Sequence, residues 1–120
     1  MDIEILSDEW LAAQIYENRD AELNHWSIDY VIDMKFDKRF PELWQFIKAT
    51  YVKDCPEYVL DNLASGALED FLVGAGEQYF DEIEKLSNSD PRFKKLLRGV
   101  WQNEMPREFW LRICELRELS

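Results

Sequence analysis

The chain has 120 residues, 47% of them apolar and 14% aromatic, and its 25 acidic against 14 basic side chains give a net charge of −11. A chain of this length fits one folded domain, residues 1–120, that buries roughly two thirds of its unfolded surface. The acidic excess disfavours direct binding to nucleic acid, because that affinity depends on Lys and Arg side chains that neutralise phosphates.

Membrane and metal contexts are also disfavoured by the sequence. The N-terminal stretch MDIEILSDEW is acidic and lacks the basic start and long apolar run of a signal peptide. No apolar run approaches the roughly 20 residues that span a bilayer, so we expect a cytoplasmic protein without membrane contact. Cys55 and Cys114 show no CxxC or Cys/His spacing, so we expect reduced thiols and neither a metal ion nor a cofactor.

The first third of the chain predicts two helices after a short N-terminal segment. That segment, DIEIL, alternates like a short strand, and it is the one strand signal that we find. Ser7 or Asp8 can cap a helix that follows it. A second, amphipathic helix is predicted over residues 21–34, with Asp29 and Asp33 turned towards solvent.

The middle of the chain predicts short helices separated by Pro and Gly. Pro41 suits a first helical turn, and apolar residues at helical spacing extend this third helix to about Tyr51. Pro56 opens a fourth helix, which we expect to be broken by the Ser65 and Gly66 pair.

The stretch FLVGAGEQYF, residues 71–80, has two interpretations. A dinucleotide-binding loop needs GxGxxG after a strand, but the third glycine position holds Tyr79, and Glu77 would repel a pyrophosphate. The glycines can instead separate two helices, the first of which ends at Gly74 or Gly76. Glu77 would then lie in the first turn of the next helix, where its charge complements the helix dipole. We favour this second interpretation.

The last third of the chain continues the helical pattern. Asp90 before Pro91 is a strong helix start, because Asp accepts free amides and Pro fixes the first helical φ. A final helix opens at Pro106. We therefore predict an all-α fold, a single helical domain in which seven or eight short helices pack as a compact bundle or array.

Three titratable residues, Glu69, Asp70 and His25, are candidates for acid–base chemistry, and a structural role is the favoured interpretation for Glu69 and His25. Glu69 and Asp70 are adjacent, so on a helix they point about 100° apart and cannot readily share one proton. Glu69 can instead reach back and cap free amides near Gly66. His25 is the single histidine, which excludes a two-His metal site, and its place in an amphipathic helix favours packing.

The charges are segregated along the chain, which favours a basic partner protein. Residues 1–34 carry a net charge of −8 and residues 54–90 a net charge of −9, whereas 35–53 and 91–120 are each +3. The alternative is that acidity only keeps a small protein soluble. Candidate contacts with the partner are the outward acidic residues of two predicted helices: Glu77, Asp81 and Glu84, with Asp29 and Asp33.

Residues 63–113 resemble a family of small bacterial proteins of unknown function. That family shares a Leu-Ala-x-Gly-x-Leu-Glu-Asp block, then Asp-Pro-x-Phe, then Leu-x-x-Val-Trp and a Trp-x-Arg-like ending. The resemblance implies no activity. The chain departs from the family pattern at Ala67, where the family tends to have Pro. By analogy with small, acidic, helical bacterial proteins, we expect an immunity protein beside a secreted toxin. The matching positions are Leu63, Ala64, Gly66, Leu68, Glu69, Asp70, Asp90, Pro91, Phe93, Leu97, Val100, Trp101, Trp110 and Arg112.

Three hypotheses about function follow from these observations. The favoured one is an immunity protein that binds a basic toxin through acidic helical surfaces and blocks its active site. The second is a phage-encoded or regulatory inhibitor that imitates the charge of a nucleic acid against another basic protein. The third is a small enzyme that uses Glu69, Asp70 or His25.

Overall fold

The protein is built from helices in the computed structural model, which describes the backbone of residues 1–15 and 17–118 and the side chains of residues 1–15 and 26–118. Within this part of the chain there are eight α-helices, one π-helical segment and no strand, which confirms the predicted all-α array. The elements are α1 Ile3–Ile15, α2 Glu17–Phe36, α3 Phe40–Tyr51, α4 Glu57–Leu63, η1 Ala64–Leu68, α5 Glu69–Ala75, α6 Phe80–Ser89, α7 Pro91–Leu97 and α8 Arg107–Glu118.

The N-terminal stretch DIEIL is helical, so the predicted strand is wrong. The Asp2 carboxylate accepts hydrogen bonds from the backbone N–H groups of Glu4, at 2.9 Å, and Ile5, at 3.2 Å. Asp2 thereby satisfies amides that a helix start leaves free, and α1 begins ahead of the predicted caps Ser7 and Asp8.

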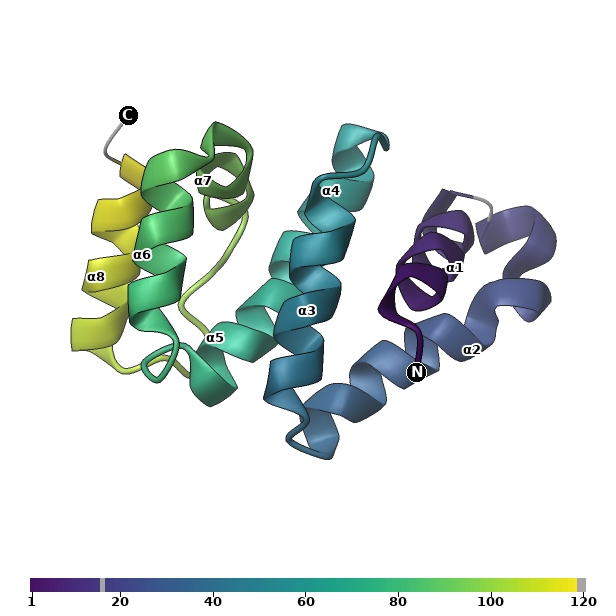
Figure 1. Cartoon of the computed structure of the whole chain (residues 1–120), viewed down its shortest axis with the longest axis horizontal. Coiled ribbons are helices and arrows are strands. Elements are labelled where there is room, and N and C mark those ends of the chain that lie inside the picture. Colours follow the sequence, from purple (N-terminus) through teal and green to yellow (C-terminus); the bar gives the residue numbers. More distant parts are fainter. Residues whose placement is uncertain (16, 119–120) are drawn as a thin grey trace.

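The helices form a row that follows the chain from one end of the molecule to the other. Figure 1 shows α1 and α2 paired at one end, α3 near the centre, and α6 and α8 side by side at the other end. Aromatic rings fill the core around α3: Trp44 stacks on Phe71 with ring centroids 5.0 Å apart and meets Phe93 edge-on at 5.8 Å. Trp44 Nε1 also donates a hydrogen bond of 2.6 Å to Glu82, which links α3 to α6.

The chain from Glu57 to Ala75 is one continuous helix, so the predicted break at Ser65 and Gly66 is wrong. The backbone stays right-handed through α4, η1 and α5, and the Glu69 N–H donates to the carbonyl of Ala64, five residues earlier. One extra residue is therefore accommodated in a π turn rather than in a break. The Ser65 hydroxyl supports the turn by donating to the carbonyl of Asp61 at 2.9 Å.

In the turn after α5, Gly76 is needed for close packing and not for a left-handed backbone. Helix α5 ends at Ala75, between the two predicted ends Gly74 and Gly76, and Gly76 keeps a right-handed backbone. A Cβ at Gly76 would lie 2.6 Å from Cζ of Phe109, so the glycine admits this ring from α8. Glu77 follows in the turn, and α6 begins at Phe80, so the predicted place of Glu77 in the first turn of that helix is wrong.

Helix α2 ends in a Schellman motif that lacks the usual glycine. The N–H of Arg39 donates to the carbonyl of Met34 at 2.8 Å, and the N–H of Lys38 donates to that of Lys35 at 3.1 Å. Lys38 adopts the left-handed conformation that this motif requires, with φ 58°. The motif turns the chain sharply into α3 and leaves Phe36 at the end of α2 (Figure 1).

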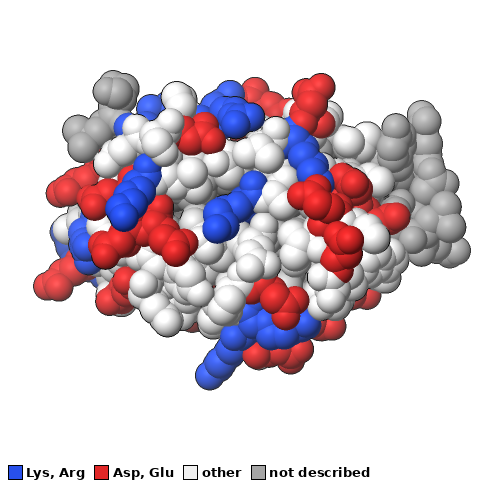
Figure 2. Space-filling model, viewed as in Figure 1, with Lys and Arg blue, Asp and Glu red and all other residues white. Residues whose placement is uncertain are grey.

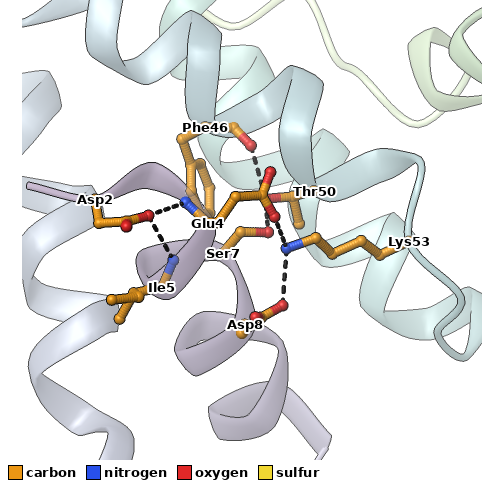
Figure 3. A network of polar contacts seen from close by, with 8 residues as sticks. All are labelled: Asp2, Glu4, Ile5, Ser7, Asp8, Phe46, Thr50 and Lys53. Atoms are coloured by element: carbon orange, nitrogen blue, oxygen red, sulfur yellow. Dashed lines mark hydrogen bonds and ion pairs between the residues drawn. The ribbon is translucent and has the colours of Figure 1, made fainter.

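A polar network joins α1 to α3 (Figure 3). At its buried centre the Ser7 and Thr50 hydroxyls lie 2.7 Å apart, and Thr50 Oγ1 donates to the carbonyl of Phe46 at 2.6 Å. At its edge Lys53 Nζ lies 2.8 Å from both Glu4 and Asp8 of α1. Partial burial alone would lower the pKa of Lys53, but the two carboxylates raise it above its ordinary value. The network fixes α1 against the end of α3.

Candidate functional site

The acidic row that the sequence places on α6 is exposed but is not wholly acidic. Asp81 and Glu84 are exposed on this helix, and Glu77 is exposed in the turn before it. Within the described residues, no ion pair joins any of the three carboxylates to a cation. Lys85, however, lies four residues after Asp81 and is also exposed, so it shares the outward face.

The two predicted acidic groups do not form one surface. Asp29 and Asp33 are exposed on α2, whereas Asp81 and Glu84 lie on α6, and α3 stands between these helices (Figure 1). Figure 2 shows acidic side chains gathered on the left and on the right of one face, with uncharged surface and basic side chains between them. Any partner that binds both groups must therefore span the molecule.

The exposed side of α2 combines these carboxylates with large apolar groups. Phe36 is 71% exposed and Ile32 46% exposed, and Trp26 near the start of the described side chains is also exposed. The spacing of three or four residues places these three with Asp29 and Asp33 on one side of the helix. We call these five residues the α2 face.

The apolar members of the α2 face were missed in the sequence, although a helical wheel contains the signal. Val31 and Met34 are buried, and they point towards the core. At 100° per residue, Ile32 and Phe36 fall on the opposite side of the helix from these two. A large apolar residue opposite a well-defined buried stripe is therefore the pattern that identifies this face.

An ion pair fixes the end of the α2 face against α5. Lys35 Nζ lies 3.2 Å from Asp70 Oδ1 and 5.4 Å from the centroid of the Phe36 ring. Both charged side chains are partly exposed, so the pair contributes no more than about 1 kcal/mol. Its value for the site is positional, because it ties the last turn of α2 to the first turn of α5.

Glu69 is structural in this arrangement, but its partners differ from those predicted. Its buried carboxylate accepts a hydrogen bond from the Trp101 backbone N–H through Oε1 and one from Asn103 Nδ2 through Oε2, both at 2.9 Å. It does not reach back to the amides near Gly66. The structure thus directs Glu69 and Asp70 to different partners, and the side chain of His25 lies outside the described residues.

The segment between α7 and α8 presents an exposed tryptophan. Trp101 is 74% exposed, the largest exposed fraction among the large apolar side chains that the structure describes. Arg117 Nη1 of α8 donates to the carbonyl of Val100 at 2.7 Å, and Gln102 Nε2 donates to that of Met105 at 3.1 Å. Asn103 turns the chain with a left-handed φ of 50°. The backbone that carries Trp101 is therefore held from several sides.

A cleft of about 610 Å³ opens between α7 and the segment from the end of α3 through α4. Leu60, Leu96 and Gly99 contribute apolar lining, and the Glu57 carboxylate meets Lys95 Nζ across the cleft at 2.7 Å. Cys55 also lines the cleft. Burial, and to a smaller extent the nearby Asp54 carboxylate, raises the pKa of this thiol. Both walls contain charged residues, and no local pattern in the sequence indicates the cleft.

Three further observations on the described part concern membranes, metal ions and thiols. No helix in it is long and apolar enough to cross a membrane. No group of three or more His, Cys, Asp or Glu side chains in it is placed to hold a metal ion. Cys55 and Cys114 are both free thiols.

Comparisons with known proteins give one match. The model of a family of unknown function (DUF6869) matches residues 14–120. No curated protein and no solved structure matches the chain. Two blocks on which the sequence resemblance rests meet in the fold, since Glu69 of the first binds the backbone of Trp101 in the third. The match extends from the end of α1 to the C-terminus, and the chain belongs to this family of unknown function.

Proposed function

We propose that this protein is an immunity-type inhibitor that binds a basic toxin through the α2 face and blocks its active site by occupancy. The observation that carries the proposal is the exposure of Phe36 and Ile32 in a stripe that also holds Asp29 and Asp33. Large apolar anchors beside charged groups are characteristic of protein interfaces, whose energy is concentrated in a few such residues.

The α2 face suits this role better than the acidic row of α6. The row holds Lys85 beside its carboxylates, and its apolar residues Phe80 and Ile83 are buried. Charges at an interface rim mainly accelerate association, whereas apolar anchors slow dissociation. An inhibitor that must stay bound needs both, and the α2 face supplies both on one helix. The row on α6 then serves to attract the basic partner at longer range.

The net charge of −11 supports a basic partner. A protein that carries this charge associates faster with a basic protein, and the effect weakens as salt screens it. The preferred partner is thus a basic toxin encoded beside the gene for this chain. Blocking requires no chemistry by the inhibitor, which is consistent with the structural role of Glu69.

A co-expression assay tests the function directly. Cells that produce the neighbouring basic toxin should survive when the wild-type chain is co-produced, and the purified pair should form a complex. The Ile32→Ser/Phe36→Ser variant should lose protection and bind at least about tenfold more weakly, since both anchors are removed. Asp29→Asn/Asp33→Asn should lower the association rate and flatten its salt dependence.

The matched control changes the other acidic group. Asp81→Asn/Glu84→Asn should alter the association rate modestly and leave the dissociation rate unchanged, because its apolar neighbours are buried. The assignment to α2 would be overturned if this control abolished protection while the Ile32→Ser/Phe36→Ser variant protected fully. The immunity function itself would be overturned if the wild-type chain neither bound nor protected against the toxin encoded beside it.

A further inference from the structure

Trp101 is exposed although its backbone is tightly held. Its N–H is bound by a buried carboxylate, Glu69, and the neighbouring carbonyl of Val100 is bound by Arg117. Burying a carboxylate is unfavourable unless it is hydrogen-bonded, and here both of its oxygens serve this one loop. The loop is therefore held in one conformation, which lowers the ordering cost when the exposed ring meets a partner.

The ring of Trp101 combines the largest exposure with the absence of a Lys or Arg contact within the described residues. Six other rings in the described residues have a Lys or Arg side chain close to the ring, with the cation 3.8 to 6.0 Å from the centroid. No cation or second ring is placed on Trp101 within the described part. The pairs are Lys35 with Phe36, Arg39 with Tyr30, Lys48 with Trp44, Arg92 with Tyr51, Arg112 with Phe80, and Arg117 with Trp110.

Trp101 is also connected to the α2 face through two consecutive residues. Glu69 binds the backbone N–H of Trp101, and the next residue, Asp70, pairs with Lys35 beside the Phe36 ring. The two most exposed aromatic side chains of the described residues are thus both tied to the first turn of α5. This helix turn therefore contacts the two segments that carry these rings.

We propose that Trp101 is a second anchor for the same basic partner and that it receives a partner Lys or Arg side chain on its ring. The proposal rests on the proposed function, because the α2 face defines the first anchor. Tryptophan is the aromatic side chain that attracts cations most strongly, and a basic partner supplies them. Glu69 acts as a positioning residue that holds the ring in place.

The test measures the affinity of the wild-type chain and its variants for the toxin identified by the co-expression assay. Trp101→Ala and Trp101→Leu should both weaken binding about tenfold, because both remove the π face. Leucine keeps apolar area and so isolates the contribution of the ring. Trp101→Phe should retain most of the affinity. Tyr58→Ala, a control at another exposed ring on α4, should bind like the wild type.

The positioning role of Glu69 requires a further comparison. Glu69→Gln should weaken binding several-fold. The double variant Glu69→Gln/Trp101→Ala should bind only slightly more weakly than Trp101→Ala, because the hydrogen bond from the loop to Glu69 affects binding only by positioning the ring. Full additivity of the two changes would overturn the positioning role. Thermal unfolding identifies variants whose weaker binding reflects lost structure.

The failure of this inference can be separated from the failure of the proposed function. If Ile32→Ser/Phe36→Ser loses binding while Trp101→Ala binds like the wild type, the second anchor is overturned and the function stands. If Trp101→Leu binds as tightly as Trp101→Phe, the contact is apolar and the cationic occupant is overturned. If the wild-type chain binds no basic toxin, the function falls and the second anchor with it.

Discussion

The Ser7 and Thr50 hydroxyl groups form a hydrogen bond of 2.7 Å between two side chains that are completely shielded from solvent (Figure 3). Thr50 in turn donates to the carbonyl of Phe46, so Ser7 is the donor and Thr50 the acceptor in this pair. A buried hydroxyl that loses its partner costs about 1–3 kcal/mol, which exceeds the net value of an average hydrogen bond.

Thr50→Val should therefore lower the free energy of unfolding by about 1–3 kcal/mol, because valine keeps the shape and leaves the Ser7 hydroxyl without its acceptor. Ser7→Ala should cost about 1 kcal/mol, since Thr50 retains its bond to Phe46. Urea unfolding measures both. The double variant should lose less than the sum of the single changes, and additive losses would show that the hydroxyls are not coupled.

Lys38→Gly should stabilise the protein by about 1 kcal/mol, because the left-handed conformation at this position costs a lysine energy that glycine does not incur. The matched control is Gln45→Gly at an exposed position of α3, where glycine should lower stability by about 1 kcal/mol. Thermal unfolding reports the sign of each change. A loss of stability in Lys38→Gly would contradict the Schellman motif at the end of α2.

Two glycine substitutions should have opposite effects. Gly74→Ala should destabilise the protein by about 1–3 kcal/mol, because its Cβ would overlap the ring of Phe40. Gly66→Ala meets no atom within 4 Å and should stabilise the helix by about 0.5–1 kcal/mol. Denaturant midpoints give the comparison. If Gly66→Ala proved as damaging as Gly74→Ala, the continuous path of the helix through η1 would be wrong.

Asp90 should make stability depend on pH in the acid range. Burial of the carboxyl group alone would raise the pKa of Asp90. Hydrogen bonds from the Tyr51 hydroxyl and the Arg92 backbone outweigh this effect and lower the pKa below its ordinary value of 3.8. A lowered folded-state pKa means that this stabilisation is complete above the unfolded pKa, near pH 4, and is lost as the pH falls through the folded value.

Asp90→Asn should accordingly cost about 1 kcal/mol at pH 7 and progressively less below pH 4. Unfolding curves measured between pH 2.5 and 7 test this. The Tyr51→Phe variant is the control, since it removes one hydrogen bond and keeps the capping carboxylate. Equal losses for Asp90→Asn at pH 7 and at pH 2.5 would show that its ionised carboxylate contributes nothing to the fold.

Local signals in the sequence account for much of the fold. Asp90 before Pro91 predicts the start of α7, and the structure shows the Asp90 side chain bound to the backbone N–H of Arg92. Gly66 was misinterpreted because a glycine weakens a helix without necessarily ending it, and tertiary packing overrides that weak preference. The predicted place of Glu77 in the first turn of α6 was wrong, and the residue before it, Gly76, packs against Phe109 from a distant part of the chain, which no local pattern shows.

The candidate site was less predictable, because its key relationships join distant residues. The acidic members of the α2 face follow from helical periodicity, whereas the exposure of Phe36 depends on what else packs on α2. The bond from Trp101 to Glu69 spans 32 residues and leaves no periodic signal in the sequence. Such pairs become apparent only when the long-range packing is known.

The π turn at η1 sets the direction in which the first turn of α5 points. It absorbs one residue locally, so without it every residue beyond η1 would be rotated by about 100° relative to α4. Regular α-helical winding of the same sequence would therefore turn the Glu69 and Asp70 side chains away from the loop and from Lys35 at the same time. A change that removes the π turn but keeps the number of residues would uncouple α5 from the segments that carry both exposed aromatic anchors.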